Sequence, residues 1–178
     1  ILAFLILSIP VVIVSWRSLS RLSNHGVYRF LAWECILWLA VNNIRYWFDD
    51  PFSIRQLVSW IFLFYCIYPV TAGVILMKKK GKSAKDRDDS LDAFEKPTEL
   101  VDTGIFAYIR HPLYSSLLFL AWGIFLKHTT LLMLVFILLD TPFLFATALL
   151  EERENMAFFG EPYREYKKKT KMFIPFVL

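Results

Sequence analysis

Long blocks of apolar residues, separated by short polar segments, restrict what this chain can fold into. The blocks lie at about residues 1–16, 30–48, 57–77, 113–126 and 131–150. Of the 178 residues 57% are hydrophobic and 20% are charged, whereas about 25% charged residues are typical of a soluble domain. Blocks of this kind are typical of membrane helices. The sequence therefore predicts an all-α integral membrane protein with about five transmembrane helices, and it excludes disorder or a coiled coil.

The blocks contain residues that are unusual in lipid. The first block has no starting methionine, and we expect it to be the end of a longer helix rather than a cleaved signal peptide. Glu34 and the Asn42–Asn43 pair should face protein or a polar cavity. Pro69 and Gly73 are expected at a kink or a close helix contact. Asp140 fits either a functional group or a satisfied residue at a kink.

The distribution of positive charge predicts the topology. With five spans, the first connection, the long polar segment 78–112 and the C-terminal tail lie on one side of the membrane. That side holds 17 of the 20 basic residues, all except Arg45, Arg55 and Lys127. Because basic residues collect on the cytoplasmic side, we expect three N-terminal spans in residues 1–77, a cytoplasmic connector in 78–112, and a helical hairpin with an amphipathic cytoplasmic tail helix in 113–178.

Other classes of site are disfavoured by residue spacing. None of the three histidines (His25, His111 and His128) has a second His or a Cys at metal-ligand spacing, so we expect no metal site. The glycines form no GxGxxG, which excludes a Rossmann nucleotide site. The net charge of +4 comes from residues that flank apolar blocks, so membrane lipids rather than nucleic acid are the expected partners.

Two polar clusters border the predicted hairpin on the cytoplasmic side. Arg110 and His111 precede Pro112, a residue favoured at the first position of a helix, where backbone N–H groups suit an anion. Glu151 and Glu152 follow the last apolar block. If the two helices are antiparallel neighbours, the clusters meet and form a pocket with both cationic and acidic groups. Taken singly, these residues also fit a membrane anchor, a helix cap and a solvated helix end.

The order of residues after Lys96 resembles a known family. The shared positions are Leu100-Val101, Gly104-Ile105-Phe106, Arg110-His111-Pro112-Leu113-Tyr114, Glu151-Glu152, Phe159-Gly160, Tyr163, Tyr166 and Pro175. Together with the hairpin they closely resemble the C-terminal half of the isoprenylcysteine carboxyl methyltransferases. That family is related to the phospholipid N-methyltransferases, and both consist of integral membrane enzymes that use S-adenosylmethionine. The first three spans carry no such resemblance.

The resemblance implies a cofactor site and a reaction. The cofactor-binding residues would be Thr98, Glu99, Leu100, Val101, Phe106, His111, Pro112, Leu113, Tyr114 and Glu151. The catalytic residues would be Arg110, His111, Glu151 and Glu152. An amine or thiol acceptor would lose its proton to His111, Glu151 or Glu152, whereas a carboxylate needs no base.

Two residues differ from the usual pattern of the family, and both differences concern the acceptor. Phe106 stands where the family usually has a tyrosine, and Thr147 stands where the prenylcysteine enzymes have an arginine thought to address the substrate carboxylate. A prenylcysteine, another isoprenoid acid, a lipid amine and a lipophilic thiol therefore stay open as acceptors. Two further classes also stay open: a membrane reductase that binds a nicotinamide cofactor in a similar C-terminal fold, and a non-catalytic membrane scaffold.

Overall fold

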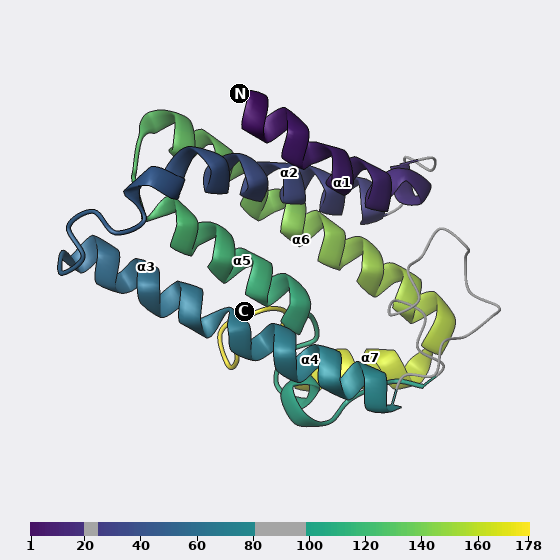
Figure 1. Ribbon diagram of the computed structural model, residues 1–178. Helices are drawn as coiled ribbons and strands as arrows, with labels where there is room; N and C mark the ends of the chain where they lie inside the picture. Colours follow the sequence, from purple (N-terminus) through teal and green to yellow (C-terminus); the bar gives the residue numbers. More distant parts are fainter. Residues whose placement is uncertain (20–24, 81–98) are drawn as a thin grey trace.

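The computed structural model describes residues 1–19, 25–80 and 99–178, and the elements within these ranges are all helices (Figure 1). The α-helices are α1 (Leu2–Leu19), α2 (His25–Asn43), α3 (Ile54–Tyr65), α4 (Ile67–Lys80), α5 (Pro112–Phe125), α6 (Leu131–Phe159) and α7 (Glu161–Lys169), and the 3-10 helices are η1 (Ile44–Tyr46) and η3 (Gly104–Ala107). The predicted all-α fold is confirmed. Thr98 and most of the predicted connector lie outside the described residues.

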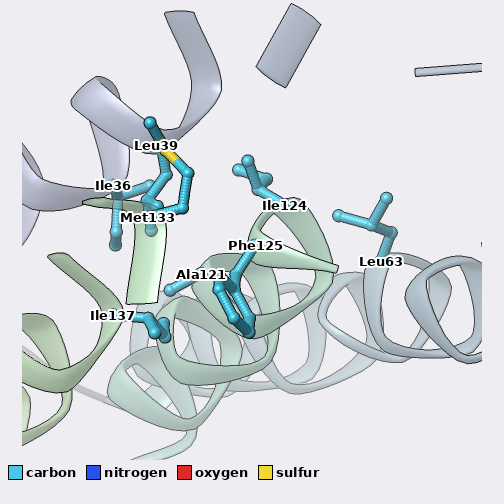
Figure 2. Close-up of a cluster of buried hydrophobic side chains, with 8 residues drawn as sticks. All are labelled: Ile36, Leu39, Leu63, Ala121, Ile124, Phe125, Met133 and Ile137. Atoms are coloured by element: carbon cyan, nitrogen blue, oxygen red, sulfur yellow. The ribbon is translucent and has the colours of Figure 1, made fainter. Parts of the chain in front are cut away.

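Three helices form the centre of the molecule. α2, α5 and α6 all contact one another, α1 packs on α2, and α3 and α4 pack on α5. Figure 2 shows the core where these helices meet. Leu39 of α2, Ala121 of α5 and Ile137 of α6 are fully buried there, and Leu63 joins them from α3. The α5–α6 hairpin, which the sequence predicts, therefore packs against α2, α3 and α4.

The third apolar block folds as two helices instead of one. α3 ends at Tyr65 and α4 begins at Ile67. Pro69 explains the break, because it has no N–H to donate to the carbonyl of Tyr65 and its ring crowds that position. Gly73, four residues later, lies against α5, since a Cβ atom there would be 2.9 Å from Leu113 Cδ1. The expected kink and the expected close contact are both present.

The outer faces of the helices are strongly apolar. Residues with more than half of their surface exposed include Leu2 and Ile13 on α1, Ile61 and Phe64 on α3, and Leu138 on α6. Patches of this extent are rare on soluble proteins. Two stretches, Ile54–Lys79 and Leu131–Phe159, are long and apolar enough to cross a membrane. α5 has only 14 residues, as the sequence predicts.

Polar side chains donate hydrogen bonds to the backbone carbonyls at the C-terminal end of this short helix. Asn43 donates to the carbonyl of Ile124 at 2.8 Å, and Arg55 donates to the carbonyls of Leu126 and Lys127. The fully buried Lys127 ammonium donates to Gln56 Oε1 at 3.0 Å and lies 3.6 Å from the centre of the Trp60 ring. The expectation that Asn43 faces protein is thus confirmed.

The C-terminal tail returns to the start of α5. The backbone N–H groups of Arg110 and His111 donate to the carbonyls of Lys171 and Met172, at 2.8 and 3.1 Å. Phe173 is fully buried among side chains of α5 and α6. These contacts place α7 beside the end of the bundle that carries the two polar clusters.

Candidate active site

An open pocket with about 890 Å³ of space, part of it open to solvent, lies at this end of the bundle. Six helical elements contribute to its walls: α2, α4, η3, α5, α6 and α7. The lining residues are Arg29, Trp33, Met77, Leu100, Val101, Phe106, Arg110, His111, Pro112, Leu113, Tyr114, Leu117, Glu151, Asn155, Phe159, Tyr163 and Tyr166. Its size and its mostly apolar walls with a few polar groups are typical of a small-molecule site.

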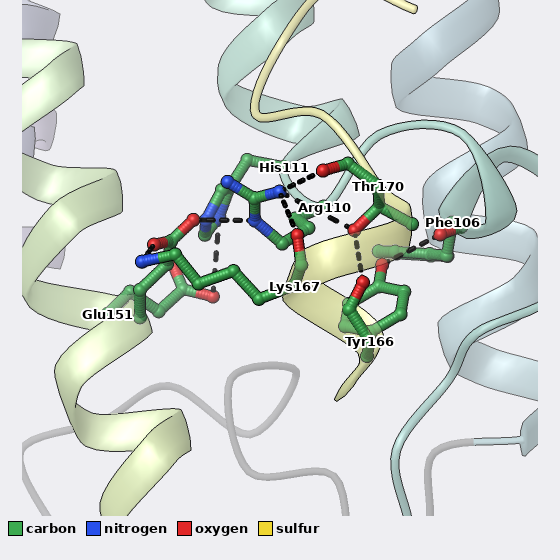
Figure 3. Close-up of polar contacts among 8 residues, drawn as sticks. Phe106, Arg110, His111, Glu151, Tyr166, Lys167 and Thr170 are labelled. Carbon is green, nitrogen blue, oxygen red and sulfur yellow. Dashed lines mark hydrogen bonds and ion pairs between the residues drawn. The ribbon is translucent and has the colours of Figure 1, made fainter. Parts of the chain in front are cut away.

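The two polar clusters meet in this pocket (Figure 3). Arg110 Nε lies 2.6 Å from Glu152 Oε1, and the two side chains are 7% and 1% exposed. Arg110 also donates to the Thr170 carbonyl, and the Lys167 ammonium lies 2.5 Å from Glu152 Oε2. A buried charge pair that has lost its water needs such additional contacts. Arg110 therefore ties the start of α5 to α6 and α7.

His111 and Glu151 lie beside this ion pair. His111 Nε2 is 3.4 Å from Glu152 Oε1, and His111 Nδ1 is 4.0 Å from Glu151 Oε1. Pro112 is the first residue of α5, so His111 occupies the cap position at the positive end of that helix. The pocket thus combines a carboxylate that suits a cation with a helix N-terminus that suits a carboxylate.

Tyrosines of α7 close another wall. The Tyr166 hydroxyl donates to the carbonyl of Phe106 at 2.7 Å. Burial raises the pKa of Tyr166 far above its ordinary value, so the hydroxyl stays protonated and remains a donor. Tyr163 is buried beside it and lines the pocket. Since Phe106 is held through its backbone, the contact does not depend on a hydroxyl at that position.

The backbone at the start of η3 requires glycine. Gly104 has a φ of +60°, and a Cβ atom there would lie 2.6 Å from Leu76 Cδ1 of α4. Only glycine adopts this conformation without strain in so narrow a space. The turn places Ile105 and Phe106 against α4.

Most of the described residues selected from the sequence line the pocket, and two of them, Glu99 and Glu152, do not. Leu100, Val101, Phe106, Leu113 and Tyr114 line it, as do Arg110, His111, Pro112 and Glu151. Glu152 lies behind the wall and holds Arg110. Glu99 is exposed and is not among the lining residues, and Thr98 lies outside the described residues.

Sequence reasoning missed part of the wall. Asn155 is one helical turn after Glu151, so its position on the same face of α6 was available as a signal. Arg29 and Trp33 of α2 and Met77 of α4 come from the spans without a recognised motif. No local pattern marks them.

Comparison with known proteins identifies the family. The family model described as phospholipid methyltransferase matches residues 59–161, which is more than half of the chain. The chain belongs to the phospholipid methyltransferase family. The matched region includes all of α5 and all of α6, so the Arg110, His111 and Glu151 cluster lies within it. The membrane methyltransferase relationship expected from the residues after Lys96 is confirmed.

Curated relatives of the chain are methanethiol S-methyltransferases. The protein from Crocosphaera subtropica is 31% identical over 81 residues, covering 46% of this chain and 31% of its own length. The one from Pseudomonas deceptionensis is 33% identical over 91 residues, covering 48% of this chain and 34% of its own. The chain thus spans about a third of the length of these relatives. No solved structure shows a significant match to the chain.

Proposed function

We propose that this chain is an S-adenosylmethionine-dependent membrane methyltransferase that transfers a methyl group to a lipophilic acceptor. The observation that carries the proposal is the convergence of Glu151, His111 and the N-terminus of α5 on one pocket within the family-matched region. The relatives are named for a thiol acceptor, and a lipophilic thiol is one of the acceptors that the sequence leaves open.

The residues present fit the cofactor. S-adenosylmethionine has a sulfonium and an ammonium, which suit the Glu151 carboxylate, and a carboxylate, which suits His111 and the N-terminus of α5. Its adenine suits the aromatic and apolar wall of Phe106, Tyr163 and Val101. When bound, it supplies an electrophilic methyl group whose former bonding electrons stay with the cofactor sulfur.

The protein's own contribution is to position the two reactants and to exclude water from the pocket. Arg110, fixed by Glu152 and Thr170, holds α5, α6 and α7 together around the pocket. Tyr166 holds the segment that carries Phe106. A displacement reaction that needs two reactants in line is accelerated by such positioning and by removal of water. If the acceptor carries a proton, Glu151 or His111 is placed to accept it.

We further propose a five-span arrangement with the pocket on the cytoplasmic side. The support is the sorting of basic residues described above and the position of Lys167, Lys168 and Lys169 on the tail helix that closes the pocket. In this arrangement the polar cofactor enters from the cytoplasm and the acceptor comes from the bilayer.

Binding of S-adenosylhomocysteine to the purified chain tests the function. We expect it to raise the thermal unfolding temperature, and we expect Glu151→Gln and His111→Ala to lose most of this shift. A nicotinamide dinucleotide should have no effect. Incubation with methyl-labelled cofactor and a total lipid extract should then label a lipophilic product. Absence of any shift with S-adenosylhomocysteine, or a shift that both variants retain, contradicts the proposal.

A further inference from the structure

The C-terminal tail, residues 161–178, has more positive charge than its own contacts neutralise. It contains one arginine and four lysines against two glutamates. Three ion pairs account for part of this charge, namely Arg164 with Glu161, Lys168 with Glu165, and Lys167 with Glu152 of α6. Lys169 and Lys171 are exposed, and neither forms an ion pair with any residue that the structure describes. The tail therefore presents a surplus of positive charge to its surroundings.

The other exposed charges at this end of the bundle do not cancel the surplus. The acidic ones are Glu99 and Asp102, in the segment before η3. The basic ones are Lys78 and Lys79 at the end of α4 and Arg153 of α6. Within the described part of the chain, these exposed cations outnumber the exposed carboxylates. The partner that the surface suits is therefore an anion outside the described residues.

Exposed apolar side chains lie beside these lysines. The backbone N–H of Lys171 donates to the carbonyl of Tyr108 at 3.0 Å, and the ring centres of Tyr108 and Phe176 are 6.0 Å apart. Phe176 and Val177 are 81% and 72% exposed. Phe176 has a φ of +66°, which bulky residues rarely adopt, yet its ring gains little burial in return. Lysines next to exposed aromatic and aliphatic side chains are typical of segments that lie in the headgroup layer of a membrane.

The inner side of the same tail closes the pocket. Tyr163 and Tyr166 of α7 line it, and the Thr170 carbonyl accepts from Arg110 (Figure 3). Lys169 and Lys171 flank Thr170 in the sequence. A contact that fixes these two lysines from outside therefore also fixes the groups that meet the pocket from inside.

We propose that the tail binds anionic phospholipid headgroups through Lys169 and Lys171, with Phe176 and Val177 in the interfacial layer, and that this contact holds α7 against the pocket. The effect on the pocket rests on the proposed methyltransferase function. A lysine near an anionic membrane surface contributes about fivefold to binding, so the two together favour the docked tail by about tenfold or more. A ligand binds more tightly when more of the protein is in the competent state. S-adenosylhomocysteine should therefore bind more tightly in an anionic bilayer.

Fluorescence quenching by lipid tests the contact without any cofactor. The full chain, with Cys35 and Cys66 replaced, receives an environment-sensitive fluorophore at Val177→Cys. It is placed in nanodiscs of phosphatidylcholine, alone or with about one third phosphatidylglycerol, together with a lipid that has a nitroxide close to the headgroup. We expect at least threefold stronger quenching in the anionic discs, and high salt should remove the difference.

Two double variants separate charge from structure. Lys169→Gln with Lys171→Gln should quench equally in both kinds of disc. Lys169→Arg with Lys171→Arg keeps the charge and should behave like the original chain. Both side chains are exposed, so neither replacement disturbs the core. Calorimetry in the same discs should show S-adenosylhomocysteine binding at least threefold tighter in the anionic lipid. The glutamine variant should lose this dependence, and the arginine variant should keep it.

The outcomes distinguish this inference from the proposed function. If S-adenosylhomocysteine binds in neither kind of disc, the proposed function fails, whereas the quenching still decides whether the tail contacts anionic lipid. Equal quenching of the original chain in both discs overturns the inference, as does a glutamine variant that keeps the difference. If the lipid contact is present but S-adenosylhomocysteine binds equally in both discs, the coupling between the tail and the pocket is overturned.

Discussion

Arg110 lies in the loop before α5, yet it connects several separate parts of the chain. Its side chain contacts Glu152 of α6 and Thr170 after α7, and its backbone N–H bonds to Lys171. Burial of both members of the ion pair makes the loss of one member costly, because the other is left as a buried and uncompensated charge.

Glu152→Gln tests this ion pair. We expect it to lower the free energy of unfolding by about 3 kcal/mol and to weaken S-adenosylhomocysteine binding. A denaturant titration in detergent measures the first effect, and calorimetry measures the second. Glu161→Gln is the control, since it removes an ion pair to Arg164 whose members are 65% and 64% exposed, and such pairs contribute less than about 1 kcal/mol. Equal losses in the two variants would show that the buried pair has no special role.

Lys127 predicts a pH dependence. Burial and the nearby Arg55 lower the pKa of Lys127 from 10.5 to about 8. Between about pH 8 and 10.5 the folded protein therefore binds fewer protons than the unfolded chain, and stability rises with pH across this window. Below about pH 8 the full cost of burying the ammonium is present, although contact with Trp60 offsets part of it.

Lys127→Met should remove this rise. We expect the stability of the original chain relative to the variant to increase by up to about 1 kcal/mol per pH unit from pH 8 upward. Thermal unfolding measured from pH 7 to pH 10.5 gives the difference, and groups that titrate in both proteins cancel. Lys169→Met, at an exposed position on α7, should show no such difference. A flat difference for Lys127→Met would mean that the buried amine keeps its ordinary pKa.

At the level of elements, two glycines allow α5 to pack closely on both of its neighbours from the third apolar block. Gly73 brings α4 against Leu113, and Gly123 brings α5 against Leu63 of α3, each with 2.9 Å between the position of a Cβ atom and the neighbouring side chain. The Gly73 contact adjoins Leu113 and Pro112, which line the pocket, whereas Leu63 lies in the apolar core.

The pair provides a matched test of how α4 shapes the pocket. We expect Gly73→Val and Gly123→Val each to cost about 1–3 kcal/mol of stability through overpacking. Gly73→Val should in addition weaken S-adenosylhomocysteine binding severalfold, because it displaces the first turn of α5. Calorimetry on both variants measures this difference. Equal binding by the two variants would show that the α4–α5 spacing does not affect the pocket.

The elements that follow simple rules could be predicted from the sequence. Pro112 marks the first residue of α5, and block lengths with flanking charges predict the hairpin that brings Arg110 to Glu152. Pro69 indicates a kink, but the sequence does not show that it separates two helices. The inward face of α2 was not predictable either. Lipid makes apolar residues favourable on every side of a helix, so hydrophobic periodicity does not reveal that Arg29 and Trp33 face the pocket.

At the level of the whole molecule, the five-span proposal places the two ends of the bundle on opposite sides of a membrane. Phe52, in the segment between η1 and α3, is 90% exposed, and Lys168 is an exposed residue of α7. Cys35 and Cys66 are free thiols and are first replaced. A single cysteine introduced at residue 52 or 168 then shows on which side of the membrane that residue lies. We expect a membrane-impermeant maleimide to label Phe52→Cys from outside the cell and Lys168→Cys only in inverted vesicles. Labelling of both from the same side would contradict the topology.

The contacts of α7 have a consequence for the order in which the protein is synthesised. Arg110 is synthesised well before the groups it meets at the C-terminal end of the chain. The Thr170 carbonyl that accepts from Arg110 follows it by 60 residues, and Tyr163 and Tyr166, which complete the pocket, come shortly before Thr170. A chain that ends before α7 therefore lacks this wall of the pocket and this contact of Arg110.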